Sequence, residues 1–289
     1  MEPSQIEQNV NKIKGLLKSE DFDVVNTGLE LLKELDENEV YEKLLDGCSV
    51  DEEGWLVNEK KEISANLVCF LSSMSNVKIA KEIKANLTKL DLSSSYFGNR
   101  IHMHLTNIDV LKYFPKIESI QLGHCRLLTN IDVLLNLKNL KSLSLHNCHS
   151  LLNLNGISEL FHLEYLDLAK CRSLINLDAL QNLKNLFKNS DETLYLTDCR
   201  SLENLNGLSS LFYITGIDLW GCKSLTNVDG LANLPNLNYL SLEGCYNINV
   251  IPDGYTMKEE DNESVELDGE ELKSYLQKIR DHIDNKKLL

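Results

Sequence analysis

The sequence predicts an α/β fold in which a helical N-terminal region precedes a solenoid with a parallel sheet on its concave side. Two observations predict it. Six segments of the form apolar-x-apolar-x-x-Cys follow one another between Ile120 and Cys245, and their cysteines are 23, 23, 28, 23 and 23 residues apart. Before these segments, apolar residues recur at helical spacing instead. A repeat of this length is typical of units that bury their apolar side only by stacking on one another.

The six segments read IQLGHC, LSLHNC, LDLAKC, LYLTDC, IDLWGC and LSLEGC. Alternation of apolar residues within each segment predicts a short strand with two inward side chains. Leucine or isoleucine then follows at every third residue, which predicts a return path over the convex side. One degenerate coil opens earlier, at Leu87, Leu90 and Leu92, so we expect about seven stacked coils.

This pattern resembles the leucine-rich repeat superfamily over roughly Leu87 to Gly254. The repeat length is similar to that of bacterial and phosphatase-regulator repeats, and the cysteine is similar to that of plant resistance-protein and F-box-associated repeats. The resemblance implies a horseshoe-shaped solenoid. It also implies a role as an adaptor, sensor or regulatory subunit.

The flanks predict three parts of the chain. Residues 1–86 lack the repeat and read as amphipathic helices, so we expect an N-terminal cap or an independent docking domain. Residues 87–255 form the solenoid, and residues 256–289 form an acidic linker followed by a C-terminal helix. The segment KEEDNESVELDGEE is expected to be a linker or loose loop because it is too polar to pack.

Short signals mark the helix ends in the N-terminal part. Ser4 and Glu7 match a capping box at the start of the first helix. Gly47 suits the stop of a short helix that carries Tyr41 and Leu44.

The charge balance and the character of the opening residues argue against several function classes. The chain has 29 basic and 44 acidic residues, a net charge of −15, which argues against general affinity for nucleic acids or anionic membranes. It opens MEPSQIEQNV, without the basic and apolar regions of an export signal, and no apolar stretch is long enough to span a bilayer. We therefore expect a monomeric cytoplasmic protein with reduced thiols.

The repeat cysteines are expected to form a structural ladder, because they lie in register beneath the turn after each strand and free cysteine is commonly buried. The ladder comprises Cys125, Cys148, Cys171, Cys199, Cys222 and Cys245. Zinc binding by these cysteines with His124, His146 and His149 is disfavoured because the side chains point in different directions. His102 and His104 are too few for a structural zinc site. No metal or cofactor is predicted.

Catalysis receives little support from the sequence. It contains no G-x-S-x-G elbow, no phosphate-binding loop of the G-x-x-x-x-G-K type and no H-E-x-x-H pair. We therefore predict that the protein is not an enzyme.

Polar columns also run through the repeats. Asparagines recur at one position and are expected to bond to turn backbone in adjacent coils. Aspartate or asparagine recurs two residues later and is expected to cap the convex turns. The two columns are Asn107, Asn130, Asn153, Asn176, Asn204 and Asn227, and Asp109, Asp132, Asn155, Asp178, Asn206 and Asp229.

A basic column directly follows the cysteines, and it consists of Arg126, His149, Arg172, Arg200 and Lys223. Like charges about 5 Å apart in water repel by about 0.8 kcal/mol per pair, so this column favours nearby acids or an anionic ligand. We favour a solvated edge with local counter-charges. An anion-binding edge for phosphate or an acidic peptide stays open.

The outward strand positions carry the main functional signal. Eighteen such positions in six coils hold no lysine or arginine but include four aromatic residues and several acids. Aromatic anchors dominate protein interfaces. We therefore predict a non-catalytic scaffold whose concave face binds a protein or peptide with basic residues, by aromatic packing and carboxylate or cation–π contacts. The predicted residues are His146, Tyr165, Asp167, Tyr195, Asp218, Trp220, Tyr239 and Glu243.

Other interpretations stay open. The aromatic residues could reflect strand propensity alone. The chain could be the substrate-recognition module of a ubiquitin-ligase-type assembly or a bacterial effector, although residues 1–86 show no convincing F-box. It could also bind glycans, since aromatic and carboxylate side chains can hold sugars.

Overall fold

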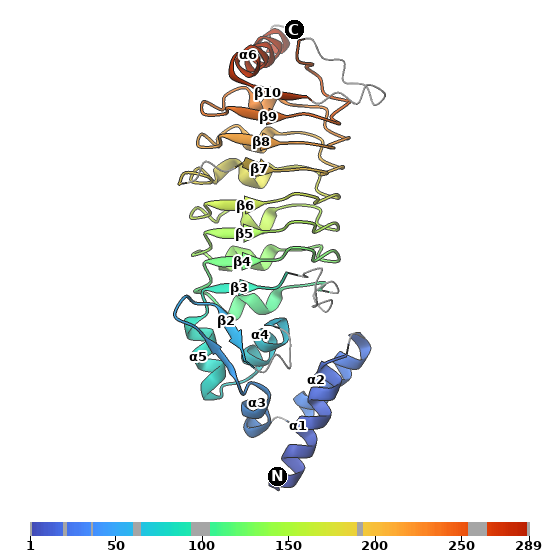
Figure 1. The fold of residues 1–289 in the computed structure, drawn as a ribbon, viewed down its shortest axis with the longest axis vertical. Helices are drawn as coiled ribbons and strands as arrows, with labels where there is room; N and C mark the ends of the chain where they lie inside the picture. The colour runs from blue at the N-terminus through green and yellow to red at the C-terminus, as the bar shows by residue number, and fades with distance from the viewer. Residues whose placement is uncertain are drawn as a thin grey trace.

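The computed structural model describes residues 2–19, 22–35, 37–59, 65–93, 105–189, 193–253 and 265–287. Helices lie at the N-terminal end, a stack of short strands fills the middle, and helix α6 lies across the other end (Figure 1). The predicted leucine-rich repeat solenoid, with its parallel sheet and helical N-terminal cap, is confirmed. The division at residues 86 and 255 remains a prediction.

The N-terminal part contains five helices and a hairpin among its described residues. The elements are α1 (Pro3–Leu17), α2 (Phe22–Leu35), α3 (Asn38–Leu44), β1 (Cys48–Val50), β2 (Leu56–Asn58), α4 (Ala65–Met74) and α5 (Lys78–Asn86). The predicted capping box is wrong: α1 begins at Pro3, and its N-cap Glu2 makes no side-chain cap. Proline suits the first helical position because its φ is preset and its missing N–H is not needed there. Gly47 lies beyond the end of α3 with φ 81°, as the helix stop requires.

The β1–β2 hairpin, which the sequence analysis missed, covers the first edge of the solenoid sheet. The N–H groups of Thr88 and Lys89 both donate to the carbonyl of Gly54, at 3.1 and 2.8 Å. Trp55 forms a parallel bridge with Lys89. A covered edge strand cannot pair with another chain, so the hairpin protects this end of the sheet.

Among the described residues, seven parallel strands line one side of the stack. β3 (Lys89–Asp91), β4 (Ser119–Gln121), β5 (Ser142–Ser144) and β6 (Tyr165–Asp167) form one ladder, and β7 (Thr193–Tyr195), β8 (Gly216–Asp218) and β9 (Tyr239–Ser241) form another. Between β6 and β7 the coils are still joined by backbone hydrogen bonds from Leu168 to Tyr195 and from Lys170 to Thr197. The interruption coincides with the longer repeat, where Phe187 is buried with a left-handed φ of 63°.

The convex side is built from 3-10 helices, and it corrects the predicted polar columns. The helices are η2 (Asp109–Tyr113), η3 (Asp132–Asn136), η4 (Asn155–Ile157), η5 (Asp178–Asn182), η6 (Asn206–Leu208) and η7 (Asp229–Leu231). Each asparagine of the first column accepts the N–H two residues later in its own coil, not in an adjacent one. That N–H belongs to the first residue of each helix, so the second column starts the helices and does not cap them.

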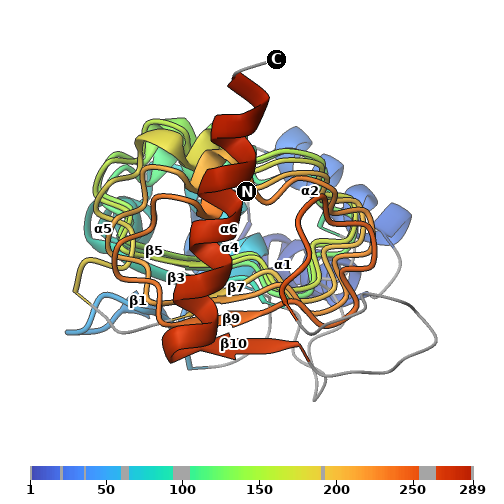
Figure 2. The same cartoon turned by 90° about the horizontal axis from the view of Figure 1, so that it is seen from above.

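The C-terminal part closes the other end. β10 (Glu266–Asp268) pairs antiparallel with β9, and α6 (Gly269–Lys287) crosses the last coil (Figure 2). The expected loose loop is therefore wrong for Val265–Asp268, because Val265 and Leu267 are buried and the open edge of β9 supplies hydrogen bonds. α6 buries Leu272, Tyr275, Leu276 and Ile279. Most of the insertion SSSYFGNRIHMHL lies outside the described residues.

Close stacking leaves no room for a side chain at Gly207, which predicts the effect of Gly207→Ala. An added Cβ would overlap the carbonyl group of Leu177 in the preceding coil. We expect this substitution to reduce the free energy of unfolding by about 1–3 kcal/mol, as overpacking commonly does, measured by urea denaturation.

The matched control is Gly15→Ala in α1, where an added Cβ meets nothing within 4 Å. There alanine should stabilise the helix by roughly 0.5–1 kcal/mol. A Gly207→Ala variant as stable as the wild type would show that the coils are not packed this closely.

Candidate functional site

The register of the last four strands brings most of the predicted partner-binding residues together. Tyr195, Asp218, Ser241 and Glu266 form one row across the sheet, and Gly216, Tyr239 and Asp268 lie in the row beside it. Trp220 and Glu243 follow Asp218 and Ser241, respectively, by two residues in the sequence. We call the group made by Tyr195, Asp218, Trp220, Tyr239, Glu243, Glu266 and Asp268 the acidic aromatic surface.

Two members of this surface, Glu266 and Asp268, were missed by the sequence analysis. Both are exposed, and they face the same side of the sheet as Ser241 and Tyr239, which they oppose in the register. The available signal was the alternation in VELD, whose buried Val265 and Leu267 predict a strand when considered apart from their acidic surroundings.

Aromatic rings and carboxylates are close neighbours on this surface. Tyr195 and Trp220 are each 45% exposed, which is high for large rings on a regular sheet. Burial raises the pKa of Tyr239, with further contributions from the charges of Glu266 and Asp218. The Tyr239 hydroxyl therefore lies in a region of negative potential.

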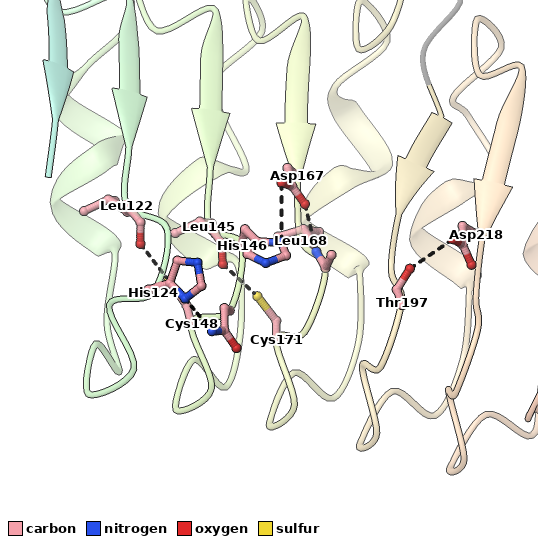
Figure 3. A network of polar contacts seen from close by, with 12 residues as sticks. Leu122, His124, Leu145, His146, Cys148, Asp167, Leu168, Cys171, Thr197 and Asp218 are labelled. Atoms are coloured by element: carbon pink, nitrogen blue, oxygen red, sulfur yellow. Dashed lines mark hydrogen bonds and ion pairs between the residues drawn. The ribbon is translucent and has the colours of Figure 1, made fainter. Parts of the chain in front are cut away.

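Some of the carboxylates also hold the backbone. Asp218 accepts the N–H of Trp220 at 2.9 Å with one oxygen. It accepts the hydroxyl of Thr197 at 3.0 Å with the other (Figure 3). Asp167 accepts the N–H of Ala169 in the same way, at 3.0 Å. These hydrogen bonds fix the carboxylates in place, and their donors are neutral groups, so the negative charge of each carboxylate is retained. Asp218, Glu243, Glu266 and Asp268 form no ion pair with any other described residue.

The remaining predicted partner-binding residues lie before the interruption between β6 and β7. His146 Nδ1 is 3.8 Å from Asp167 Oδ2, and the ring of His124 packs edge-on against His146 with centroids 5.3 Å apart (Figure 3). Tyr165 is half-buried in the row beside Asp167. The structure thus divides the predicted set into two groups.

The six repeat cysteines are buried and unbridged. Each thiol donates to a carbonyl of the preceding coil, as Cys148 does to Leu122 and Cys171 to Leu145, both at 3.2 Å (Figure 3). The other four donors are Cys125, Cys199, Cys222 and Cys245. Burial raises the pKa of Cys125 to about 12, with a smaller contribution from the charge of Asp91. Protonated thiols of this kind are poor nucleophiles and poor metal ligands.

No metal centre is formed by the described part of the chain, which contains no group of three or more histidine, cysteine, aspartate or glutamate residues able to hold an ion. His102 and His104 lie outside the described residues.

The residue before each repeat cysteine has a left-handed backbone, a feature that the sequence analysis missed. These residues are His124, Asn147, Lys170, Asp198, Gly221 and Gly244. Glycine, asparagine and aspartate at this position were the available signal, because they tolerate positive φ best. In five of the six coils the residue after the cysteine is basic, and in the last coil it is Tyr246.

In two coils the basic edge has an internal counter-charge. The carboxylate of Asp198, with its side chain only 8% exposed, lies 2.9 Å from Arg172 Nη2 and 2.6 Å from Arg200 Nε. Burial opposes ionisation of Asp198, but the hydrogen bonds from Arg200 and Arg172 outweigh it and lower its pKa. At the end of the column, Lys223 Nζ lies 6.0 Å from the ring centroid of Tyr246.

Comparison with known proteins finds similarity to solved structures. No family model and no curated protein matches the chain. Internalin C2 from Listeria monocytogenes is 19% identical over 69% of this chain and 81% of its own, with a TM-score of 0.47. The functional domain of InlJ from the same organism, which includes a cysteine ladder, is 18% identical. The match covers 57% of this chain and 40% of the InlJ chain, with a TM-score of 0.38.

A plant structure is similar over more of this chain and less of its own. The leucine-rich repeat ectodomain of the Arabidopsis thaliana receptor kinase GASSHO1/SCHENGEN3, in complex with CASPARIAN STRIP INTEGRITY FACTOR 2, is 18% identical over 81% of this chain and 32% of its own, with a TM-score of 0.37.

In the part of our chain that the structure describes, no helix combines the length and apolar character needed to cross a bilayer.

The buried thiols predict a loss of stability at high pH. The ordinary thiol pKa is 9.0, whereas Cys125 and Cys199 stay protonated in the folded protein up to about 12. The unfolded chain therefore releases protons that the folded chain retains, and stability should fall as pH rises above about 9. Urea midpoints at pH 7.5 and pH 10 measure this loss.

Labelling with a thiol reagent at pH 8 provides the control. The native protein should leave its eight buried cysteines unreacted, and all should react after denaturation. Rapid labelling of the native protein would show that the ladder is accessible.

Proposed function

Because the chain has the leucine-rich repeat fold, we propose that it is a non-catalytic scaffold that binds a protein segment rich in lysine or arginine on its acidic aromatic surface. The observation that carries this proposal is the exposure of Tyr195 and Trp220, each 45%, beside carboxylates that have no cation among the described residues. Aromatic side chains exposed on a rigid sheet are typical anchors of protein interfaces.

Lysine and arginine fit both components of the surface. A cation over a tyrosine or tryptophan ring gains about 0.5–1 kcal/mol at an exposed site and more when water is excluded. The same cation can form charge-assisted hydrogen bonds with Asp218 or Glu266. The net charge of −15 also favours encounter with a basic partner and makes the encounter rate sensitive to salt.

The rigidity of the surface supports binding. Asp218 is fixed by two hydrogen bonds, and β10 is held by its register with β9. Little conformational entropy is therefore lost in ordering these groups when a partner binds. A longer partner can follow the sheet toward Tyr165, Asp167 and His146, which lie on the same face.

The test removes the two exposed rings together. Peptides are selected from a random display library on the wild-type protein, and their affinities are measured by isothermal titration calorimetry. We expect lysine- or arginine-rich peptides, and we expect Tyr195→Ala with Trp220→Ala to weaken them at least about 30-fold, the effect of losing hot-spot side chains. The melting temperature should change little, because neither ring belongs to the buried core.

Phe161→Ala is the matched control, since Phe161 is an aromatic residue with 53% exposure that lies outside the strands. It should leave affinity unchanged. Glu266→Gln with Asp268→Asn removes two charges at nearly constant shape and should reduce the salt dependence of binding. Selected peptides without basic residues, or full affinity in the double aromatic variant, would refute the proposal.

A further inference from the structure

The repeats provide an internal comparison of the basic edge. Arg172 and Arg200 lie in adjacent coils, and Asp198 places its carboxylate between them. Asp198 can do so because it directly precedes Cys199 with φ 58°, while its N–H donates to the carbonyl of Trp220 at 2.6 Å. One turn geometry thus supplies an anion for two basic residues.

The same turn two coils earlier has no anion. Asn147 precedes Cys148 with φ 64°, and its N–H donates to the carbonyl of Ala169 at 2.7 Å. Its backbone therefore matches that of Asp198. Its side chain is a neutral amide, and Nδ2 lies 2.6 Å from Nδ1 of His124. The two basic residues related to Arg172 and Arg200 are here Arg126 and His149.

The consequence is visible in the hydrogen bonding of these two residues. Arg126 Nε and His149 Nε2 are buried atoms without a hydrogen-bond partner, as is one further side-chain atom of the described residues, Ser72 Oγ. A buried donor without an acceptor carries the full cost of its lost hydration. An acceptor placed between the two coils would remove that cost.

The surroundings of Arg126 and His149 are positive. Burial lowers the pKa of His149, and the charges of Arg172 and Arg126 lower it further, whereas Asp198 opposes them. Burial also lowers the pKa of His124, with contributions from His146, Arg126 and Lys170. In a chain of net charge −15, this edge is a local basic patch.

We propose that Arg126 and His149 bind an oxyanion, a carboxylate or phosphate carried by an acidic segment of a partner protein, in the role that the Asp198 carboxylate has for Arg172 and Arg200. The guanidinium and imidazole N–H groups donate to the oxyanion. Leu127 directly follows Arg126 and Leu152 lies three residues after His149. They are 46% and 50% exposed, so they can contact aliphatic residues of the same segment.

Asn147→Asp tests the proposal, because it builds into this turn the carboxylate that Asp198 provides in the other. Three fluorescent peptides of alternating leucine and a polar residue are compared at constant ionic strength, with glutamate, phosphoserine or glutamine as the polar residue. The wild type should bind one or both of the anionic peptides at least tenfold more tightly than the glutamine peptide. Asn147→Asp should remove that preference and raise the pKa of His149 in an NMR titration.

Asn11→Asp in α1 adds the same charge at an exposed position elsewhere, and it should keep the preference. Arg126→Gln with His149→Gln should lose it. The Tyr195→Ala and Trp220→Ala variant should keep it, so failure here is distinguishable from failure of the acidic aromatic surface. The glutamate and phosphoserine arms identify the source of the oxyanion. Equal binding of all three peptides, or full preference in Asn147→Asp, would overturn the proposal.

Discussion

The whole molecule depends on the burial of one stripe of leucine-type side chains between neighbouring coils. Residues such as Leu143, Leu166 and Leu194 are fully buried, yet a single coil would leave them in water. Each contributes roughly 1.5–3 kcal/mol only when the next coil is in place. Stacking therefore fixes the strand register, and the register in turn arranges every other side chain of the repeat into columns.

Stacking explains what the sequence could predict and what it could not. The period determines the middle of the fold. The outward Tyr195 and Asp218 follow from strand alternation, and the cysteine ladder follows from the recurrence of cysteine at one position of each coil. The two ends are unique contacts without a period. β10 was missed for that reason: only Val265 and Leu267 are apolar in an acidic segment, and their burial depends on the open edge of β9.

The polar contacts of the edge were less predictable than the sheet. Asp198 reaches both Arg172 and Arg200 only because its backbone is left-handed, and a sequence pattern gives residue types rather than φ values. The asparagine column shows the same limit. Its spacing is visible in the sequence, but whether Asn130 bonds within its own coil or to the next one depends on the conformation of the turn.

A repeated backbone also lets single residues set the sign of local charge. Asp198 neutralises one turn of the edge, and Asn147 leaves the equivalent turn positive, although their backbone hydrogen bonds are alike. The carboxylates of the acidic aromatic surface lie in later coils, from β8 to β10. Because adjacent strands are about 4.8 Å apart, the two proposed sites lie at different heights of one rigid stack. A partner with an acidic and a basic segment would therefore bind in one direction only, since the reversed orientation would place like charges together.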